Sequence, residues 1–457
     1  MKKITSRTII CFILALVLVF GTGVFTVKYF IEGRSWASFS ANKHLYTDSV
    51  LNTGRILDRN GEVLADYDEN NKTWDFANSS NMRKALLHSV GDPTGMIGTG
   101  ALTRFSDKLT GYNFITGAKP LFPGGRDLYL TLDADVSETA YKALNGHKGT
   151  VGVYNYKTGE IICMVSSPTY DPSSPPTIKD GDPSYEGVYL NRLISSTFIP
   201  GSTFKLITAT AAIETIDDVQ TRTFHCDGKI IIDNQVITCS DTHGDLDFSK
   251  ALAVSCNCVF GTLATEIGSE QMQNYAEKAG LTDSLSINGI NTAKSTFDFA
   301  SGGTGNLAWS GIGQGKDLVN PCSLMVFCGA IANQGSAAKP QIISHTAFSE
   351  SVQTSLYFRH STKELINKDT AQILGNMMRN NVVTKYGKDN FPGLEICAKS
   401  GTAQSDSSSK DNAWFAGFLR DEAHPYAFVV LVEEGGSGSR VAGKVANTVL
   451  QAAIKND

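Results

Sequence analysis

An uncharged segment close to the N-terminus constrains this chain more than any other feature. No charged residue occurs between Ile9 and Val27. As a helix, a segment of this length crosses most of the ~30 Å hydrocarbon core of a membrane. The alternative is a cleaved secretory signal, but the apolar run exceeds the usual core of about 7–15 residues and no A-x-A cleavage site follows it. We therefore expect a transmembrane helix over residues 8–30.

The charges beside this segment predict its orientation. Lys2, Lys3 and Arg7 precede it, and positively charged flanks stay on the cytoplasmic side of a membrane. Residues 1–7 are therefore predicted to be a cytoplasmic tail, and everything after about residue 31 is predicted to be extracellular. No second apolar run of this length occurs in the sequence, so we expect a single-pass membrane protein.

The composition of the chain argues against several classes of protein. The 457 residues carry a formal net charge of -5, whereas a nucleic-acid-binding protein needs a basic face. A hydrophobic fraction of 41% with 19% charged residues argues against a disordered chain. Nine cysteines in a chain of this length are too few for a disulfide scaffold. The length predicts two or three globular domains.

Strand patterns occur towards both ends of the chain. Residues 54–65 contain an Asn-Gly turn between two strand-like segments, and residues 149–167 predict a second hairpin. Further strands are predicted at 127–132, 394–404, 413–419 and 426–434.

Helical patterns occupy much of the remainder. A helix that begins at Asp133 is predicted to end at Leu144, another is predicted over 441–454, and about 186–345 is predicted to be mostly helical. The simplest assembly is an α/β (α+β) fold. One antiparallel sheet made from both ends of the chain carries helices on its faces, with a helical insert between its two groups of strands.

The first of three short motifs that carry chemistry is the segment Pro200–Lys205, which precedes an apolar helical segment. Positions i and i+3 share a helix face, so Lys205 can reach Ser202. A serine is a weak nucleophile until a base takes its proton, and a lysine in a poorly solvated site can be that base. The start of the helix also offers backbone N–H groups to a developing oxyanion.

The second motif is Ser255-Cys256-Asn257, which follows a helical stretch. Its hydroxyl and its amide lie two positions apart and can face the same cleft. One can relay a proton while the other holds a substrate amide.

The third motif is Lys399-Ser400-Gly401-Thr402, inside a predicted strand. Gly401 has no side chain, so a substrate backbone can lie against the strand. The cation of Lys399 and the hydroxyls of Ser400 and Thr402 suit a carboxylate.

Each of these motifs also occurs elsewhere by chance, for example at Ser40–Lys43, Ser79–Asn81 and Lys157–Gly159. Context separates the copies. The third of these lies in a hairpin turn, and the first lacks both a Pro-Gly start and a following apolar helix. Only in the set described above does each motif lie on the element that its chemistry needs.

Taken together, the motifs resemble those of class B penicillin-binding proteins, the monofunctional D,D-transpeptidases of peptidoglycan synthesis. GRILDRNGEVLA at 54–65 resembles the start of the family's N-terminal pedestal, and GTVGVYNYKTGEIICMVSSPTYDP at 149–172 resembles the first hairpin of its catalytic domain. The short PbpA-like form is the most similar. Two departures are a shorter pedestal and Cys256 at the middle position of the second motif, where Asp is usual.

The resemblance implies a fold and a division into domains. The fold would be that of penicillin-binding transpeptidases and serine β-lactamases, with a small pedestal over 31–125 and a transpeptidase domain over 126–457. The part of the chain before residue 149 is too short for a glycosyltransferase domain as well. The implied polymerase is a partner membrane protein of the shape, elongation and division family.

The resemblance also implies roles for the motif residues. Ser202 would attack the D-Ala-D-Ala bond of a stem peptide with Lys205 as general base, and β-lactams would trap the same serine. Ser255 would pass a proton to the leaving group, Asn257 would hold a substrate amide, and Lys399 would set the potential of the site. Ser400 and Thr402 would grip the terminal carboxylate, and the backbone N–H groups of Ser202 and Thr402 would form the oxyanion hole.

Three other functions use the same motifs. A D,D-carboxypeptidase passes the acyl group to water, and a β-lactamase hydrolyses a β-lactam acyl-enzyme with an additional base. A non-catalytic β-lactam sensor or wall-assembly scaffold would keep the fold, although the intact Ser202, Lys205 and Lys399 argue against it. Turnover on a cross-linking substrate separates these alternatives.

No cofactor is expected to be needed for catalysis, but one cluster of residues is a candidate for a structural zinc site. Cys226, Cys239, His243 and Cys256 follow the spacing C-x12-C-x3-H-x12-C, and three thiolates with one imidazole make a tetrahedral zinc set. Some elongation-type relatives resemble this arrangement. The alternatives are a Cys226–Cys239 disulfide, closed by a hairpin over IIIDNQVIT, and four unrelated buried side chains. If its segment is extended, Cys256 points opposite to its two neighbours in the motif.

Overall fold

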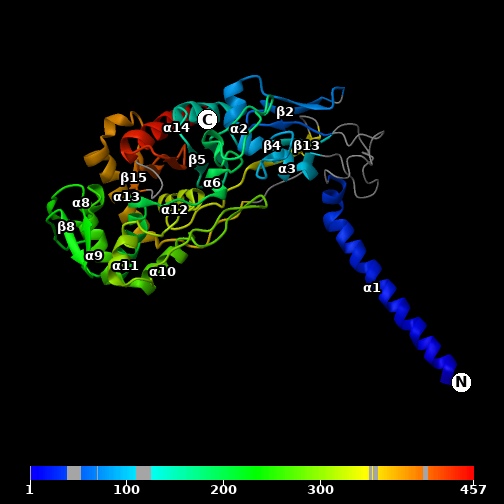
Figure 1. The fold of residues 1–457 in the computed structure, drawn as a ribbon, viewed down its shortest axis with the longest axis horizontal. Coiled ribbons are helices and arrows are strands. Elements are labelled where there is room, and N and C mark those ends of the chain that lie inside the picture. The colour runs from blue at the N-terminus through cyan, green and yellow to red at the C-terminus, as the bar shows by residue number, and fades with distance from the viewer. Residues whose placement is uncertain are drawn as a thin grey trace.

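The computed structural model describes residues 2–38, 53–68, 70–109, 125–348, 352–353, 359–404 and 410–456. Helix α1 (Lys2–Ser38) leaves the folded body as a single rod (Figure 1). Its segment Arg7–Gly33 is long and apolar enough to cross a membrane, as the sequence predicts. The chance motif at Ser40–Lys43 lies outside the described residues.

A five-stranded sheet joins the two ends of the chain. Its antiparallel strands run in the order β15 (Ile396–Ala403), β16 (Asn412–Leu419), β17 (Tyr426–Val432), β5 (Gly149–Asn155) and β6 (Ile161–Ser167). The prediction of one antiparallel sheet from both chain ends is therefore confirmed. Strand β15, which carries the third motif, lies at the edge of this sheet.

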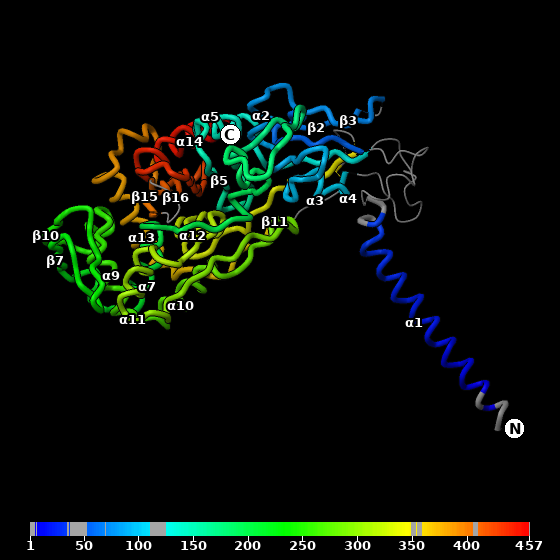
Figure 2. Tube along the Cα trace, viewed as in Figure 1, coloured from blue at the N-terminus to red at the C-terminus, as the bar shows by residue number. Residues whose placement is uncertain are grey.

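Both faces of this sheet are buried, which explains why β17 is a continuous apolar run. Val430 belongs to the core under α5 (Ala134–Leu144) and α14 (Gly443–Asn456), whereas Val429 belongs to the core under α12 (Pro321–Ala332) on the other face. Figure 2 shows the C-terminal segment beside α5. The side chain of Asp133 caps α5 by accepting from Val136 N, as predicted.

A second sheet lies at the end of the body next to α1. Its order is β14 (Val352–Gln353), β13 (Ile343–Phe348), β4 (Asp127–Leu130), β1 (Ile56–Leu57), β2 (Val63–Asp68) and β3 (Thr73–Phe76). The predicted hairpin of β1 and β2 is confirmed. Strands β4 and β13 come from the segment assigned to the transpeptidase domain, so the sheet ties that segment to the pedestal. The boundary at residue 125 stays a prediction.

The central segment contains the predicted helices and several small strands. The helices are α6 (Arg192–Ser195), α7 (Lys205–Thr215), α8 (Phe248–Ala253), α9 (Asn257–Ile267), α10 (Ser269–Lys278) and α11 (Gly303–Gly311). The strands are β7 (Phe224–Cys226), β8 (Lys229–Ile232), β9 (Gln235–Thr238), β10 (Gly244–Leu246), β11 (Ser286–Ile287) and β12 (Ile290–Asn291). Strands β8 and β9 form the hairpin expected between Cys226 and Cys239. The other short strands were missed, because elements of two or three residues show no period.

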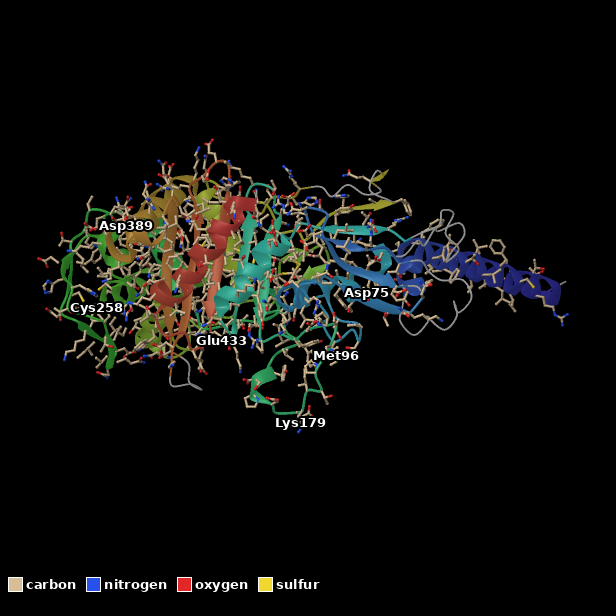
Figure 3. The ribbon with its side chains drawn as sticks, turned by 90° about the horizontal axis from the view of Figure 1, so that it is seen from above. Asp75, Met96, Lys179, Cys258, Asp389 and Glu433 are labelled. Atoms are coloured by element: carbon tan, nitrogen blue, oxygen red, sulfur yellow. The ribbon has the colours of Figure 1, made fainter. Side chains whose placement is uncertain are left out.

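The remaining elements are short, apart from α2 and α13. They are α2 (Ser80–Val90), α3 (Ala101–Arg104), α4 (Ser106–Leu109), α13 (Lys368–Asn381), the 3-10 turns Pro183–Tyr185, Gly201–Thr203 and Lys388–Asn390, and the π-helical turns Val382–Tyr386 and Gly438–Ala442. Figure 3 places Cys258 of α9 at the end of the body far from α1, and Asp75 of β3 at the near end.

Asp58 joins the pedestal hairpin to α5, the helix that supports the five-stranded sheet. Its buried carboxylate accepts from Asn60 N at 2.8 Å and Glu62 N at 2.9 Å inside the turn, and from Ala134 N at the start of α5 at 3.2 Å. One side chain therefore satisfies three backbone donors on two separate segments.

Replacing Asp58 with Ala is expected to lower the free energy of unfolding by about 2–3 kcal/mol, because the buried N–H of Ala134 and two part-buried N–H groups of the turn lose their acceptor. Thermal melting of the purified protein measures this change. The control is Asp66→Ala, which removes an exposed carboxylate from β2 of the same sheet. Equal melting temperatures for the two variants would contradict this role of Asp58.

Candidate active site

The first motif forms a tight turn at the start of α7. Gly201–Thr203 is a 3-10 turn, and Lys205 is the first residue of the helix. Gly201 has a positive φ of 54°, and a Cβ built there would lie 2.6 Å from Thr402 O. Only glycine therefore lets the turn approach β15 this closely. Ser202 is partly exposed, whereas the side chain of Lys205 is fully buried.

Lys205 extends from this turn to the second motif. Its Nζ donates to Ser255 O at 2.6 Å, to Ser255 Oγ at 3.1 Å and to Asn257 Oδ1 at 2.6 Å. No hydrogen bond among the described residues links Lys205 Nζ to Ser202 Oγ. The lysine of the first motif is therefore held by the second motif beside the serine it was predicted to activate.

The second motif lies at the start of α9. Ser255 has a left-handed φ of 58°, Cys256 is the N-cap, and Asn257 is the first helical residue. The segment is thus not extended, so the condition of that expectation is not met, although Cys256 is buried while its two neighbours are partly exposed. Asn257 Nδ2 also donates to Thr238 O at 2.7 Å. Sequence reasoning missed this partner because a backbone carbonyl leaves no residue signature.

The third motif brings a second lysine to the same hydroxyl. Lys399 Nζ donates to Ser255 Oγ at 3.1 Å and to Ser400 O at 2.8 Å. Ser255 Oγ therefore accepts from Lys205 and from Lys399. The structure thus brings the three motifs together at one hydroxyl, although they are far apart in the sequence.

Gly401 has a different neighbour from the one that the sequence suggests. A Cβ built there would lie 2.9 Å from both Pro200 O and Thr203 Cγ2. The missing side chain therefore makes room for the protein's own Ser202 turn. Contact of this strand with a substrate backbone stays a proposal.

Ser400 and Thr402 have partners that the sequence did not predict. Tyr386 is buried at the end of the π-helical turn, and its hydroxyl accepts from Ser400 N at 3.0 Å and from Ser400 Oγ at 3.1 Å. Thr402 is exposed, and its carbonyl accepts from Gln314 Nε2 at 3.4 Å. Neither Tyr386 nor Gln314 belongs to a recognisable motif.

The pKa values of both lysines lie well below their ordinary value. Burial lowers the pKa of Lys205 to about 7, despite an opposing effect from the nearby cysteine sulfurs. Burial also lowers the pKa of Lys399 well below its ordinary value, and the neighbouring charge of Lys205 lowers it further. A neutral amine is therefore available in this site near neutral pH.

A cluster of sulfur atoms lies behind the second motif. One ligand atom each from Cys226, Cys239, His243 and Cys256 lies within 4.8 Å of all the others. The Cys226 and Cys239 sulfurs are 3.7 Å apart, well beyond the ~2.05 Å of a disulfide bond, so that alternative is not formed in this structure. Their convergence also argues against four unrelated buried side chains.

Cys239 connects this cluster to the start of α9. Its Sγ accepts from Asn257 N at 3.1 Å and from Cys258 N at 3.3 Å. A hydrogen bond from Cys256, together with the backbone N–H of Cys258, lowers the pKa of the Cys239 thiol. The sulfur cluster thus holds the backbone of a residue whose side chain faces the candidate active site.

Comparisons with known proteins agree with this geometry. The pattern of the penicillin binding protein transpeptidase domain matches residues 149–451. The peptidoglycan D,D-transpeptidase PbpA of Mycolicibacterium smegmatis is 27% identical over 378 residues, which cover 75% of each chain. The structure of PBPA from Mycobacterium tuberculosis superposes with a TM-score of 0.77 at 22% identity, covering 89% of this chain and 100% of that one. The penicillin G acyl-enzyme complex of penicillin-binding protein A from the same organism superposes with a TM-score of 0.75 at 22% identity, covering 89% of this chain and 100% of that one.

These matches define the class of the protein. The chain belongs to the penicillin-binding protein transpeptidase family. Within that family it is a class B penicillin-binding protein of the PbpA type.

Proposed function

We propose that this protein is a serine-type peptidoglycan D,D-transpeptidase that cross-links stem peptides through an acyl-enzyme on Ser202. The observation that carries the proposal is the convergence of Lys205 and Lys399 on Ser255 Oγ, next to the turn that holds Ser202. Two buried amines joined by a hydroxyl form a route along which protons can move.

Acylation begins with the removal of a proton from Ser202. Neutral Lys205 is the base, and Ser202 Oγ attacks the carbonyl carbon of the D-Ala-D-Ala bond. The backbone N–H groups of Ser202 and Thr402 stabilise the oxyanion. Ser255, which contacts both lysines, passes a proton to the leaving amine, and D-Ala departs.

Deacylation completes the cross-link. The amine of a neighbouring stem peptide attacks the ester carbonyl, a new amide bond forms, and Ser202 regains its proton. Asn257 holds a substrate amide during both steps. Lys399, Ser400 and Thr402 bind the terminal carboxylate of the donor peptide. β-Lactams carry an acyl group and a carboxylate in the same places, so they acylate Ser202.

We also propose that α1 anchors this activity at the outer face of the cell membrane, with residues 1–7 in the cytoplasm. The predicted orientation rests on Lys2, Lys3 and Arg7 before the apolar segment. A membrane glycosyltransferase of the shape, elongation and division family would supply the glycan strands.

A structural zinc ion is proposed for the sulfur cluster. Cys226 of β7, Cys239 after β9, His243 before β10 and Cys256 at the start of α9 form a donor set of the type that zinc prefers. The bound ion would tie four separate segments together behind the second motif. It would contribute stability and the position of Asn257, and no chemical step needs it.

Ser202→Ala is expected to abolish covalent labelling by a fluorescent penicillin while the melting temperature stays near that of the wild type. The reason is that the variant loses the nucleophile and no buried contact. Mass mapping of the labelled wild-type protein identifies the modified serine. Labelling that persists in Ser202→Ala, or that maps to Ser40 of the chance motif, would contradict the assignment.

Protein purified without a histidine tag is expected to contain about one zinc per chain, because four ligands converge. Elemental analysis measures the metal, and Cys256→Ser should lower both the zinc content and the melting temperature. Cys322→Ser is a matched control, since Cys322 is buried in α12 away from the cluster. The zinc site would be ruled out if the wild-type protein, as purified, contained no zinc and melted at the same temperature as Cys256→Ser.

A further inference from the structure

Helix α13 and the π-helical turn that follows it close one edge of the strand that carries the third motif. Strand β15 ends the sheet order, so its outer edge faces no strand among the described residues. Arg379 donates to Ile396 O at 3.0 Å, and Asn381 Nδ2 donates to Ala398 O at 3.0 Å. Protein side chains therefore use the outward carbonyl groups of Ile396 and Ala398 in the first half of the strand.

Tyr386 provides the last of these contacts, at Ser400. Outward-pointing backbone groups alternate along a strand, so after Ile396, Ala398 and Ser400 the next outward residue is Thr402. The Tyr386 hydroxyl oxygen accepts a hydrogen bond from Ser400 N at 3.0 Å. The edge becomes open to a ligand at Thr402, which among the described residues has one hydrogen bond beyond those within the sheet, the long, exposed contact with Gln314 at 3.4 Å.

This position determines where a peptide that pairs with β15 has to end. An extended peptide can add to a strand edge through backbone hydrogen bonds. Such a peptide would meet the closed part of the edge at Ser400, beside the buried cation of Lys399. A peptide that terminates there places its carboxylate next to a cation and a hydroxyl, whereas a peptide that continues meets Tyr386.

The hydroxyl of Tyr386 also controls what Ser400 can donate. A hydroxyl carries one proton and can accept two hydrogen bonds. In this structure the Tyr386 oxygen accepts both from Ser400 N and from Ser400 Oγ, 3.1 Å away. In the proposed complex the Ser400 hydroxyl turns to the carboxylate, and Tyr386 donates its own proton to Ser400 Oγ in exchange, so that donors in this chain strengthen one another.

Packing fixes the Tyr386 ring in place for this role. The ring lies edge-on to Phe415 with centroids 5.6 Å apart, and Phe415 is the cross-strand partner of Ser400. Burial raises the pKa of Tyr386, so the phenol keeps its proton at physiological pH.

We propose that Tyr386 is a positioning residue that makes the site selective for a peptide ending in a free carboxylate, by closing the edge of β15 at Ser400 and by directing the Ser400 proton to that carboxylate. This inference rests on the proposed transpeptidase function. It adds a determinant of substrate choice outside the three motifs.

The test compares two probes that differ only in the carboxylate, penicillin G and penicillin G methyl ester. Acylation rate constants are measured by mass spectrometry on the full-length protein and on Tyr386→Phe, which keeps the ring and removes the hydroxyl. Loss of hydrogen bonding to a charged group predicts a fall of about tenfold to a hundredfold for the acid. For the ester we expect a change below about threefold.

Tyr154→Phe is the matched control, because its buried hydroxyl has no hydrogen-bond partner in the described part of the chain. This control should change neither rate. Equal losses of both probes in Tyr386→Phe, or no loss for the acid, would overturn the proposal. A wild-type protein that reacts with neither probe would instead overturn the proposed function on which it rests.

A double variant shows whether Tyr386 acts through Ser400. If it does, the double variant that combines Tyr386→Phe with Ser400→Ala should react with penicillin G at a rate constant within about threefold of that of Ser400→Ala alone. The reason is that the effects of coupled residues are not additive. Losses that multiply would show an independent effect of Tyr386 and would overturn the positioning role.

Discussion

The active site depends on two buried lysines that share one serine hydroxyl, and the rest of the structure has to hold them there. A charged amine is costly to bury, and two of them side by side cost more. Lys205 and Lys399 are held close together because Ser255 Oγ accepts a hydrogen bond from each of them. Ser255 O and Asn257 Oδ1 accept further hydrogen bonds from Lys205. The same burial that makes the pair costly lowers the pKa of Lys205 to about 7 and gives the site a base that works near neutral pH.

To place these groups together, three segments have to approach one another closely: the Ser202 turn, the loop before α9, and β15. The Ser202 turn can lie against β15 because Gly201 and Gly401 have no side chains to clash with Thr402 O and Pro200 O. Behind the loop before α9, Cys239 accepts from the first two backbone N–H groups of that helix. The site is therefore built from a helix start, a loop and a strand edge, each fixed by contacts with neighbouring segments.

Much of this arrangement could be predicted from local pattern, and the remainder could not. The sheet strands, the cap at Asp133 and the three motifs have signatures of a few residues each. The partners of those motifs do not. Thr238 contributes only a carbonyl, and Tyr386 lies 14 residues before Ser400 in a π-helical turn that has no sequence signal. The joining of β4 and β13 into the pedestal sheet depends on long-range pairing, which local pattern does not encode.

The most direct test of this account is the pH dependence of Ser202 acylation by penicillin in the free enzyme. Since Lys205 acts as the base only when neutral, the second-order rate constant should rise about tenfold per pH unit below about pH 7 and level off above it. The inflection reports the pKa of the essential base in the free enzyme. A rate constant that stays flat from about pH 5 to about pH 9 would contradict the account, because the proton of Ser202 would then be removed by some other route.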